Sequence, residues 1–557
     1  MQTSTARPAS LRLASWQSWA AAVLSAALLE LPFPIAGPMP PWRSVFAWFA
    51  LVPLLCALLA RGDSTRPHPL RRAFLLGYLC GFLWYIGNCY WIRDTMSRYG
   101  DMPPFAPTLL LVGFSLVLGL YFGLFGWGVV LVRRATGSTR LALAFAPFLW
   151  TALELAAARI TSVPWDQLGY SQVDNGFVSQ LAPWTGVYGI TFLLVAVNAL
   201  AAGSFVLGKR TISGSLAGIS LAIVAVGATW SDKYPQASPT SATAVLIQPN
   251  LDVAGTGYWQ GPGEWDRHMA DFTRLAAEQC KSYIAGIPQT GAPTLNPPCP
   301  AQPAHPDLVV WPESPAPFFE SDPRFQHSMP QIARTEDAPL IVNAIGSHFS
   351  AADNDWQDYV SAVIFSADGA EVGRYDKIHL VPFGEYVPFA RLLFFAHKLT
   401  GKVAAYTPGD QVRVFHIEGP DGQTHRYGVF ICYESVFADQ IRQFARQGAE
   451  VLVNISDDGW YGDTSAPWQH FNMARMRAIE NRRWLLRDTN NGVTAVIDPY
   501  GRVRQSIPRH QVDALPAQFA FRSDITFYTA HGDLFAWLCV ILSIAVASWC
   551  AMRQELR

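Results

Sequence analysis

The chain has 557 residues, 41 Lys and Arg against 42 Asp and Glu, and a hydrophobic content of one half. This composition argues against an intrinsically disordered chain, and it gives no basic footprint for nucleic acid. Only 15% of the residues are charged, whereas soluble globular proteins have about 25%. We therefore expect part of the chain to lie in lipid.

Eight apolar segments are long enough to cross a bilayer core, which needs about 20 helical residues. They are residues 13–31, 43–60, 73–91, 107–132, 141–158, 186–207, 213–230 and 533–551. The first segment resembles a secretory signal, but no small-residue cleavage site separates it from Leu31. We expect eight transmembrane helices, seven in residues 1–230 and one in residues 533–557, around a globular domain at residues 231–532.

The positive charges in the loops between the predicted spans predict how the chain is oriented in the membrane. Thirteen Lys and Arg lie in the two tails and in alternate connections, and four lie in the opposite connections. Because positive residues collect on the cytoplasmic side, both termini are predicted inside and the globular domain outside.

The globular domain alternates β-rich runs with helical stretches. The predicted strands are residues 243–248, 308–311, 340–345, 359–365, 427–431, 451–455 and 493–497, and the predicted helices are residues 266–283, 438–447 and 467–484. This alternation predicts an α/β layered fold. Asp368 and Gly369, between two strand-like runs, predict a hairpin turn.

Eight cysteines divide between the two regions. Cys56, Cys80, Cys89, Cys539 and Cys550 fall in or beside the predicted spans, where they act as small apolar residues. The globular domain holds Cys280, Cys299 and Cys432. Cys280 and Cys299 flank a Pro- and Gly-rich insertion; in an oxidising compartment they either pair or stay reduced, and pairing leaves Cys432 as the free thiol.

Three predicted strands end in residues that can do chemistry together. Cys432 follows an apolar run, and a thiol becomes a nucleophile when a neighbour removes its proton. Glu313 follows a second run and can act as a base, and Lys377 follows a third and can stabilise an oxyanion. Singly, each has a plain alternative, because most Glu and Lys are solvated surface charges and many Cys are buried structural residues.

The order Glu, Lys, Cys at strand ends of an α/β domain resembles the nitrilase superfamily over about residues 243–520. With seven predicted spans before the domain and one after it, the whole chain resembles the apolipoprotein N-acyltransferase family. The resemblance rests on residues 381–389 (VPFGEYVPF), 432–434 (CYE), 458–463 (DGWYGD), 467–480 (PWQHFNMARMRAIE) and 489–494 (TNNGVT).

This resemblance implies an α-β-β-α sandwich and a set of site residues. Glu313 is the implied general base, Lys377 the oxyanion stabiliser and Cys432 the nucleophile. Glu385, Tyr433 and Glu434 are the implied supporting residues. Trp265, Trp460, Tyr461 and Glu480 are implied to line or brace the substrate pocket, with Trp259 as the alternative to Trp265.

The resemblance also implies the reaction and its place. An acyl chain passes from a membrane phospholipid, through a Cys thioester, to the α-amino group of a diacylglyceryl-cysteine on an apolipoprotein. The implied location is the bacterial inner membrane, with the catalytic domain on the periplasmic side. We expect a monomer that needs no cofactor, metal or nucleic acid.

Other interpretations stay open at this point. A tethered nitrilase-type amidohydrolase would pass the thioester to water, and a transporter would need more ionisable residues in its spans than Glu154. A Cys–His pair would need His379 or His470 beside the thiol, which nothing in the sequence indicates. The apolar residues 389–399 are either a lid that dips into the outer leaflet or a core helix.

Overall fold

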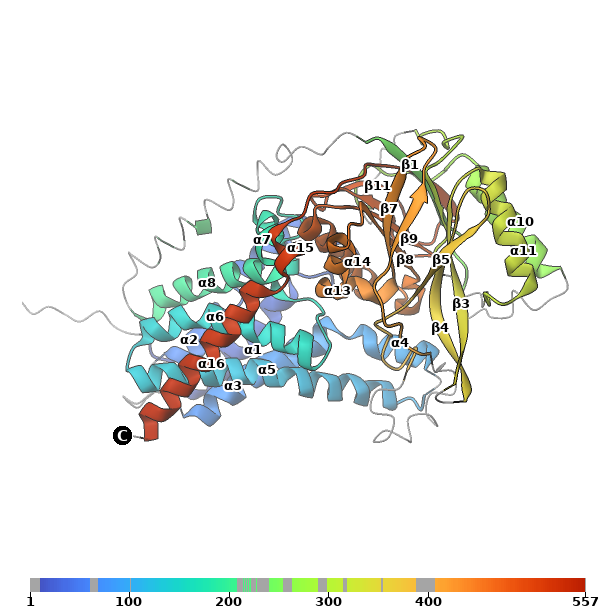
Figure 1. The fold of residues 1–557 in the computed structure, drawn as a ribbon. Coiled ribbons are helices and arrows are strands. Elements are labelled where there is room, and N and C mark those ends of the chain that lie inside the picture. The colour runs from blue at the N-terminus through green and yellow to red at the C-terminus, as the bar shows by residue number, and fades with distance from the viewer. Residues whose placement is uncertain are drawn as a thin grey trace, which may run out of the picture.

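The computed structural model describes residues 11–60, 69–100, 102–207, 240–253, 263–288, 298–313, 318–351, 354–386 and 406–555, with the isolated positions 214, 216, 218, 220, 221 and 227. The chain forms a helical bundle with an α/β domain at one end of it, and the C-terminal helix returns from the domain to the bundle (Figure 1). The predicted lid and Trp259 lie outside the described residues.

Helices from both ends of the chain, most of them apolar, build the bundle. They are α1 (Ser15–Glu30), α2 (Val52–Leu59), α3 (Leu70–Asn88), α4 (Trp91–Tyr99), α5 (Ala106–Thr136), α6 (Thr139–Ile160), α7 (Ala182–Thr185), α8 (Val187–Val206) and α16 (Leu534–Glu555), with the 3-10 turns η1 (Pro41–Trp48), η2 (Leu168–Gln172) and η3 (Val178–Leu181).

The described helices support several membrane spans but do not reach the predicted eight. Five are long and apolar enough to cross a membrane, or six if α3 and α4, which meet at a 46° bend, count as one broken span. The predicted first span forms α1, which has only 16 residues. The predicted seventh span, residues 213–230, falls mostly outside the described residues.

The α/β domain contains two six-stranded sheets. The first has the order β12-β1-β2-β3-β4-β5 and the second β11-β10-β9-β8-β7-β6. The strands are β1 (Ala242–Gln248), β2 (Leu308–Val310), β3 (Leu340–Ser350), β4 (Asp355–Phe365), β5 (Glu371–Asp376), β6 (Val414–Glu418), β7 (Thr424–Ile431), β8 (Val451–Ser456), β9 (Trp484–Thr489), β10 (Thr494–Ile497), β11 (Val503–Ile507) and β12 (Asp513–Phe519). Strands β1, β2 and β3 run parallel, as do β7, β8 and β9, so each sheet has a parallel centre.

Alternating side chains place a core on each face of the first sheet. Ala244 and Leu246 of β1 point into the core that the two sheets share, and Val245 and Ile247 point into a second core. That second core is covered by α10 (Glu264–Ala277) and α11 (Pro323–Glu336). Helices α13 (Ala438–Arg446) and α14 (Ala466–Asn481) lie between the second sheet and the bundle (Figure 1). The four layers confirm the predicted α-β-β-α sandwich.

The local predictions are largely confirmed. All seven predicted strands form, and Gly369, at φ +82°, makes the turn between β4 and β5. The helix predicted at residues 266–283 ends earlier, at Ala277, just before Cys280 bonds to Cys299. The sequence pattern missed β6, β9, β11 and β12, whereas β5 is the run after Gly369 that was expected to end at Lys377.

Candidate active site

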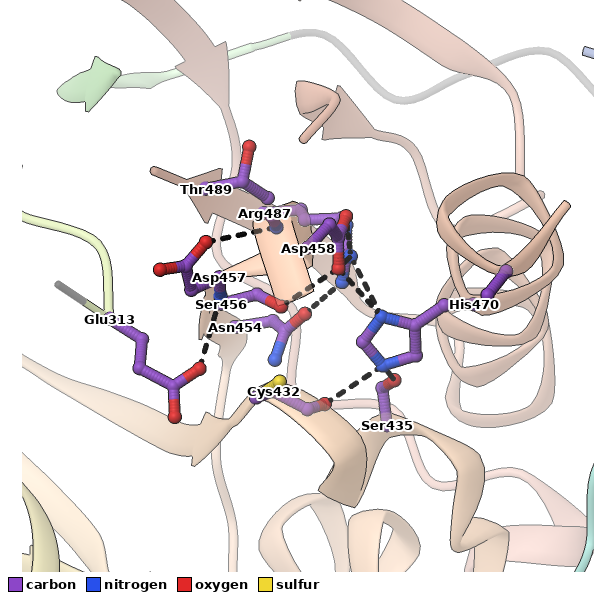
Figure 2. Close-up of polar contacts among 12 residues, drawn as sticks. Glu313, Cys432, Ser435, Asn454, Ser456, Asp457, Asp458, His470, Arg487 and Thr489 are labelled. Atoms are coloured by element: carbon purple, nitrogen blue, oxygen red, sulfur yellow. Dashed lines mark hydrogen bonds and ion pairs between the residues drawn. The ribbon is translucent and has the colours of Figure 1, made fainter. Parts of the chain in front are cut away.

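Three strand ends from the two sheets meet in one buried cluster. Glu313 lies just beyond β2, Lys377 directly follows β5, and Cys432 directly follows β7. The ammonium Nζ of Lys377 is 3.2 Å from Glu313 Oε1 and 2.6 Å from Glu385 Oε1. Cys432 is buried and interacts electrostatically with both Glu313 and Lys377, and Figure 2 shows its thiol beside the Glu313 carboxylate. The structure therefore brings together all four residues.

Burial and charge set the protonation of this cluster. Burial acts to lower the pKa of Lys377, but the carboxylates of Glu313 and Glu385 outweigh it and raise that pKa well above its ordinary value. Burial, and then the negative charge of Glu313, raise the pKa of Cys432 well above that of a free thiol, although Lys377 opposes them. The resting site thus holds a charged lysine and a neutral thiol.

Cys432 occupies an unusual backbone conformation. It opens the 3-10 turn η5 (Cys432–Val436) with φ +49°, in the left-handed region that non-glycine residues rarely adopt. Such a conformation costs about 1–3 kcal/mol and persists only where the surroundings hold it. Two hydrogen bonds flank it: Ile431 N–H donates to Glu434 Oε2 at 2.8 Å, and His470 Nε2 lies 3.0 Å from the Cys432 carbonyl oxygen.

Glu434 joins η5, the turn that Cys432 opens, to the strand end that carries Lys377. Its Oε1 accepts hydrogen bonds from Tyr375 Oη at 2.7 Å, from the N–H of Ile378 at 2.7 Å and from Gln440 Nε2 at 2.7 Å. Its side chain is fully buried. Glu434 therefore fixes β5 and β7 relative to each other and does not face the reacting atoms.

A second buried charge cluster stands behind Cys432. Arg487 of β9 donates to Asp458 Oδ2 at 2.8 Å, and Asp458 Oδ1 lies 2.9 Å from His470 Nδ1. All three side chains are fully buried. Figure 2 shows Glu313 and His470 on opposite sides of Cys432. His470 contacts the backbone carbonyl of Cys432, whereas a Cys–His pair would need a contact between the imidazole and the thiol.

Aromatic side chains of the bundle meet aromatic side chains near Cys432. Trp165 stacks on Tyr433 with ring centroids 6.4 Å apart, and Trp91 packs edge-on against Tyr461 at 5.2 Å. Trp460 packs against a tyrosine of α4 and stays 42% exposed. Tyr433, Tyr461 and Trp460 therefore lie where the domain and the bundle meet.

The other two predicted pocket residues lie elsewhere. Glu480 is fully buried on α14, where its Oε1 accepts from Arg477 at 3.1 Å and from the N–H of Val187 in α8 at 3.2 Å. Trp265 belongs to the second core, packs edge-on against Phe318 at 5.1 Å and lies under the guanidinium of Arg324. These contacts are those of a junction residue and a core residue.

Sequence reasoning missed Asn454, Ser456 and Arg487, and it gave Asp458 and His470 no role beside Cys432. The available signal was a polar residue directly after three apolar strand residues: Asn454 in β8 and Arg487 in β9 both follow such a run, and both are completely buried. Buried polar groups need partners, so such residues mark a polar network.

Comparisons with known proteins agree with this geometry. Residues 12–200 match the model of the apolipoprotein N-acyltransferase N-terminal domain, and residues 267–514 match that of carbon-nitrogen hydrolases. The apolipoprotein N-acyltransferase of Geobacter metallireducens is 34% identical over 96% of this chain and 95% of its own. The chain belongs to the apolipoprotein N-acyltransferase family.

Further relatives carry the same family name. The apolipoprotein N-acyltransferase of Chlorobaculum tepidum is 29% identical over 96% of each chain, and that of Vibrio vulnificus is 30% identical over 91% of this chain and 93% of its own. Among solved structures, Saccharomyces cerevisiae Nit3 of the nitrilase superfamily is 17% identical, covers 51% of this chain and has a TM-score of 0.31. As a member of the apolipoprotein N-acyltransferases, the chain is an acyltransferase with a nitrilase-type catalytic domain.

Proposed function

We propose that this enzyme moves a fatty acyl chain from a membrane phospholipid to the α-amino group of S-diacylglyceryl-cysteine at the N-terminus of an apolipoprotein. The observation that carries the proposal is the Lys377 ammonium held between Glu313 and Glu385 beside the thiol of Cys432, in a chain of this family. No cofactor enters the proposed reaction.

In the first half-reaction, the Cys432 sulfur attacks the carbonyl carbon of a phospholipid ester while its proton moves to Glu313. The charged Lys377 stabilises the oxyanion that develops. The ester C–O bond then breaks, the proton on Glu313 passes to the departing alkoxide, and a lysophospholipid leaves. The acyl chain remains on Cys432 as a thioester.

In the second half-reaction, the free α-amino group of the acceptor attacks the thioester. Glu313 takes a proton from the attacking nitrogen, and Lys377 again faces the oxyanion. The C–S bond breaks, the sulfur regains a proton, and the product is an amide. Because Glu313 both receives and returns protons, its carboxylate is needed in each half-reaction.

The other site residues have supporting roles in this proposal. Glu385 holds Lys377 in place, Glu434 fixes the nucleophile turn, and Tyr433, Trp460 and Tyr461 shape the lipid-facing side. For Glu480, the contact with α8 supports a bracing role at the domain junction. Trp265 has the weakest support as a substrate residue, because its described contacts are those of the second core.

A lipid substrate fits the placement of the site. Each buried CH₂ of an acyl chain is worth about 0.8 kcal/mol, so extracting two-chain lipids into water is costly. The bundle carries a small pocket lined by Trp84, Phe122 and Trp150 and also by Glu154 and Asp166, and Trp165, which lines it too, stacks on Tyr433.

The proposal includes a topology. The enzyme is a monomer of the bacterial inner membrane with eight spans, seven in residues 1–230 and one in residues 533–557. Residues 231–532 form a periplasmic catalytic domain, and both termini lie in the cytoplasm. The excess of Lys and Arg in alternate connections supports this orientation.

The test is to incubate the purified enzyme with phospholipid carrying a labelled acyl chain and a synthetic diacylglyceryl-cysteine peptide. The proposal predicts a triacylated peptide by mass spectrometry and its loss in the Cys432→Ala variant. Labelled free fatty acid without amide would instead favour the tethered amidohydrolase.

A further inference from the structure

The imidazole of His470 contacts the backbone of Cys432. It lies on α14 with a fully buried side chain, and its Nε2 is 3.0 Å from the carbonyl oxygen of Cys432 and 2.7 Å from Ser435 Oγ (Figure 2). A carbonyl oxygen only accepts hydrogen bonds, so Nε2 carries the proton. The hydroxyl of Ser435 can accept or donate and is compatible with that assignment.

The other ring nitrogen of His470, Nδ1, lies beside the ion pair of Asp458 and Arg487. His470 Nδ1 lies 2.9 Å from Asp458 Oδ1 and 3.1 Å from Arg487 Nη2, so both an acceptor and a donor face it. With the single proton on Nε2, Nδ1 accepts from Arg487 Nη2. The Oδ1 of Asp458 then accepts from Arg487 Nη2 at 3.0 Å and from Ser456 Oγ, so Asp458 acts on the ring by holding Arg487. Burial, followed by the charge of Arg487, lowers the pKa of His470, which agrees with a neutral ring at neutral pH.

The ion pair of Asp458 and Arg487 is held in place by side chains of β8. Ser456 Oγ donates to Asp458 Oδ1 at 3.2 Å, and Arg487 Nη1 donates to the side-chain oxygen of Asn454. Asn454 and Ser456 belong to β8, next to the strand that ends at Cys432. The sheet therefore fixes the position of the imidazole.

A hydrogen bond to this carbonyl has consequences for the next residue. The carbonyl of Cys432 and the N–H of Tyr433 belong to one planar trans peptide unit and point in opposite directions. Holding the carbonyl toward His470 turns the Tyr433 N–H away from His470. The N–H at the start of a helical turn has no acceptor within that turn, so it is free to face a substrate.

We propose that His470, oriented by Asp458 and Arg487, is a positioning residue that fixes the Cys432–Tyr433 peptide plane and so aims the Tyr433 N–H at the oxyanion formed during acyl transfer. This inference rests on the proposed function, because it needs acylation of Cys432. It also accounts for how Cys432 keeps φ +49°.

The test compares His470→Gln with His470→Met in the full-length enzyme. The glutamine amide nitrogen can replace Nε2 as a donor, whereas methionine fills a similar volume without one. We expect His470→Met to slow Cys432 acylation by labelled phosphatidylethanolamine about 10²-fold, the typical cost of a misplaced reacting group, with KM unchanged. His470→Gln should recover most of that loss.

Alkylation of the thiol separates this role from general damage. Iodoacetamide reacts with Cys432 without forming an oxyanion on a carbonyl, so its rate should fall much less than the acylation rate in His470→Met. Equal losses in both reactions, no recovery in a folded His470→Gln variant, or an unchanged acylation rate in His470→Met would overturn the inference. If His470→Met fails to fold, the His470→Gln and Asp458→Asn variants decide it: His470→Gln should stay active, and Asp458→Asn should lose acylation selectively.

The two proposals can fail separately. Wild-type enzyme that forms neither a Cys432 adduct nor a triacylated peptide would reject the proposed function. Wild-type enzyme that forms both, with a fully active His470→Met variant, would reject only the role of His470.

Discussion

Cys432 sits among charges that act in opposite directions. Glu313 and burial keep its proton on the sulfur, whereas Lys377 favours the thiolate. A thiol of this kind does not react because it is already ionised; it needs a base in place when the substrate arrives. In the proposed mechanism Glu313 is that base, and its ion pair with Lys377 at 3.2 Å holds it in place.

This balance predicts the pH dependence of thiol alkylation in the absence of substrate. Since the pKa of Cys432 is raised well above its ordinary value, the thiolate fraction should rise about tenfold per pH unit through pH 9 without levelling off. The unfolded enzyme, with a thiol pKa of about 8.5, should level off. Iodoacetamide labelling followed by peptide mass spectrometry measures both profiles; a plateau below pH 8 in the folded enzyme would contradict the account.

The charged cluster could be predicted from the sequence because Glu313, Lys377 and Cys432 stand at strand ends, which the fold gathers. Glu313 and Cys432 end apolar runs, whereas Lys377 follows β5, a strand with charged residues of its own. The contact of His470 could not be predicted in this way. Its partner is a main-chain carbonyl 38 residues earlier, which carries no signal in the sequence.

At the level of elements, Glu434 connects the end of β5 to the end of β7. Five donors face its two oxygens: Tyr375, Ile378, His379, Gln440 and Ile431. A carboxylate can accept from all of them, whereas an amide cannot.

In the Glu434→Gln variant, the amide N–H₂ group therefore faces other hydrogen-bond donors. An unsatisfied buried group costs about 1–3 kcal/mol, and a shift of the nucleophile turn can lower kcat about 10²-fold. Thermal unfolding and acyl-transfer kinetics measure the two effects. A Glu434→Gln variant with wild-type stability and kcat would show that this connection is unnecessary.

Helix α14 is polar yet buried on nearly every side. Its side chains bond to the second sheet on one side and to the bundle on the other: Gln469 donates to the carbonyl of Asn88 at 3.1 Å, and Arg475 pairs with Asp174 at 2.7 Å. The sequence predicted the helix. Its burial was not predictable, because polar residues on a helix normally indicate a face exposed to solvent. Only the structure shows that the second sheet and the bundle cover both sides of α14.

A double-mutant cycle tests this junction. Removing one partner of a buried ion pair typically costs about 3–5 kcal/mol, because the other charge is left unpaired. We expect Arg475→Met and Asp174→Asn each to lower stability in detergent, and the double variant to lose much less than the sum of the two. Additive losses would mean that the pair does not couple the domain to the bundle.

In the whole molecule, the bundle and the catalytic domain form one unit through such contacts. Arg159 at the end of α6 pairs with Asp439 of α13 at 3.1 Å and with Asp533, at the start of the last helix, at 2.5 Å. The composition and the apolar runs sufficed to predict a membrane part and an outer domain. They could not predict how the two pack, since those contacts join residues hundreds of positions apart.

The proposed topology can be tested with single introduced cysteines. Gln423→Cys lies in the exposed turn between β6 and β7, and Thr139→Cys lies at the first residue of α6, next to the connection from α5. In spheroplasts, a membrane-impermeant maleimide should label Gln423→Cys and should reach Thr139→Cys only after lysis. The reverse pattern would place the catalytic domain in the cytoplasm.

The covalent intermediate tests the central claim most directly. Enzyme incubated with phospholipid alone is digested and mapped by mass spectrometry, and a second sample then receives the diacylglyceryl-cysteine peptide. The account predicts an added acyl mass on Cys432 that disappears as the triacylated peptide forms at the same rate. Triacylated peptide produced without any acyl group on Cys432, or an adduct that the acceptor never removes, would contradict it.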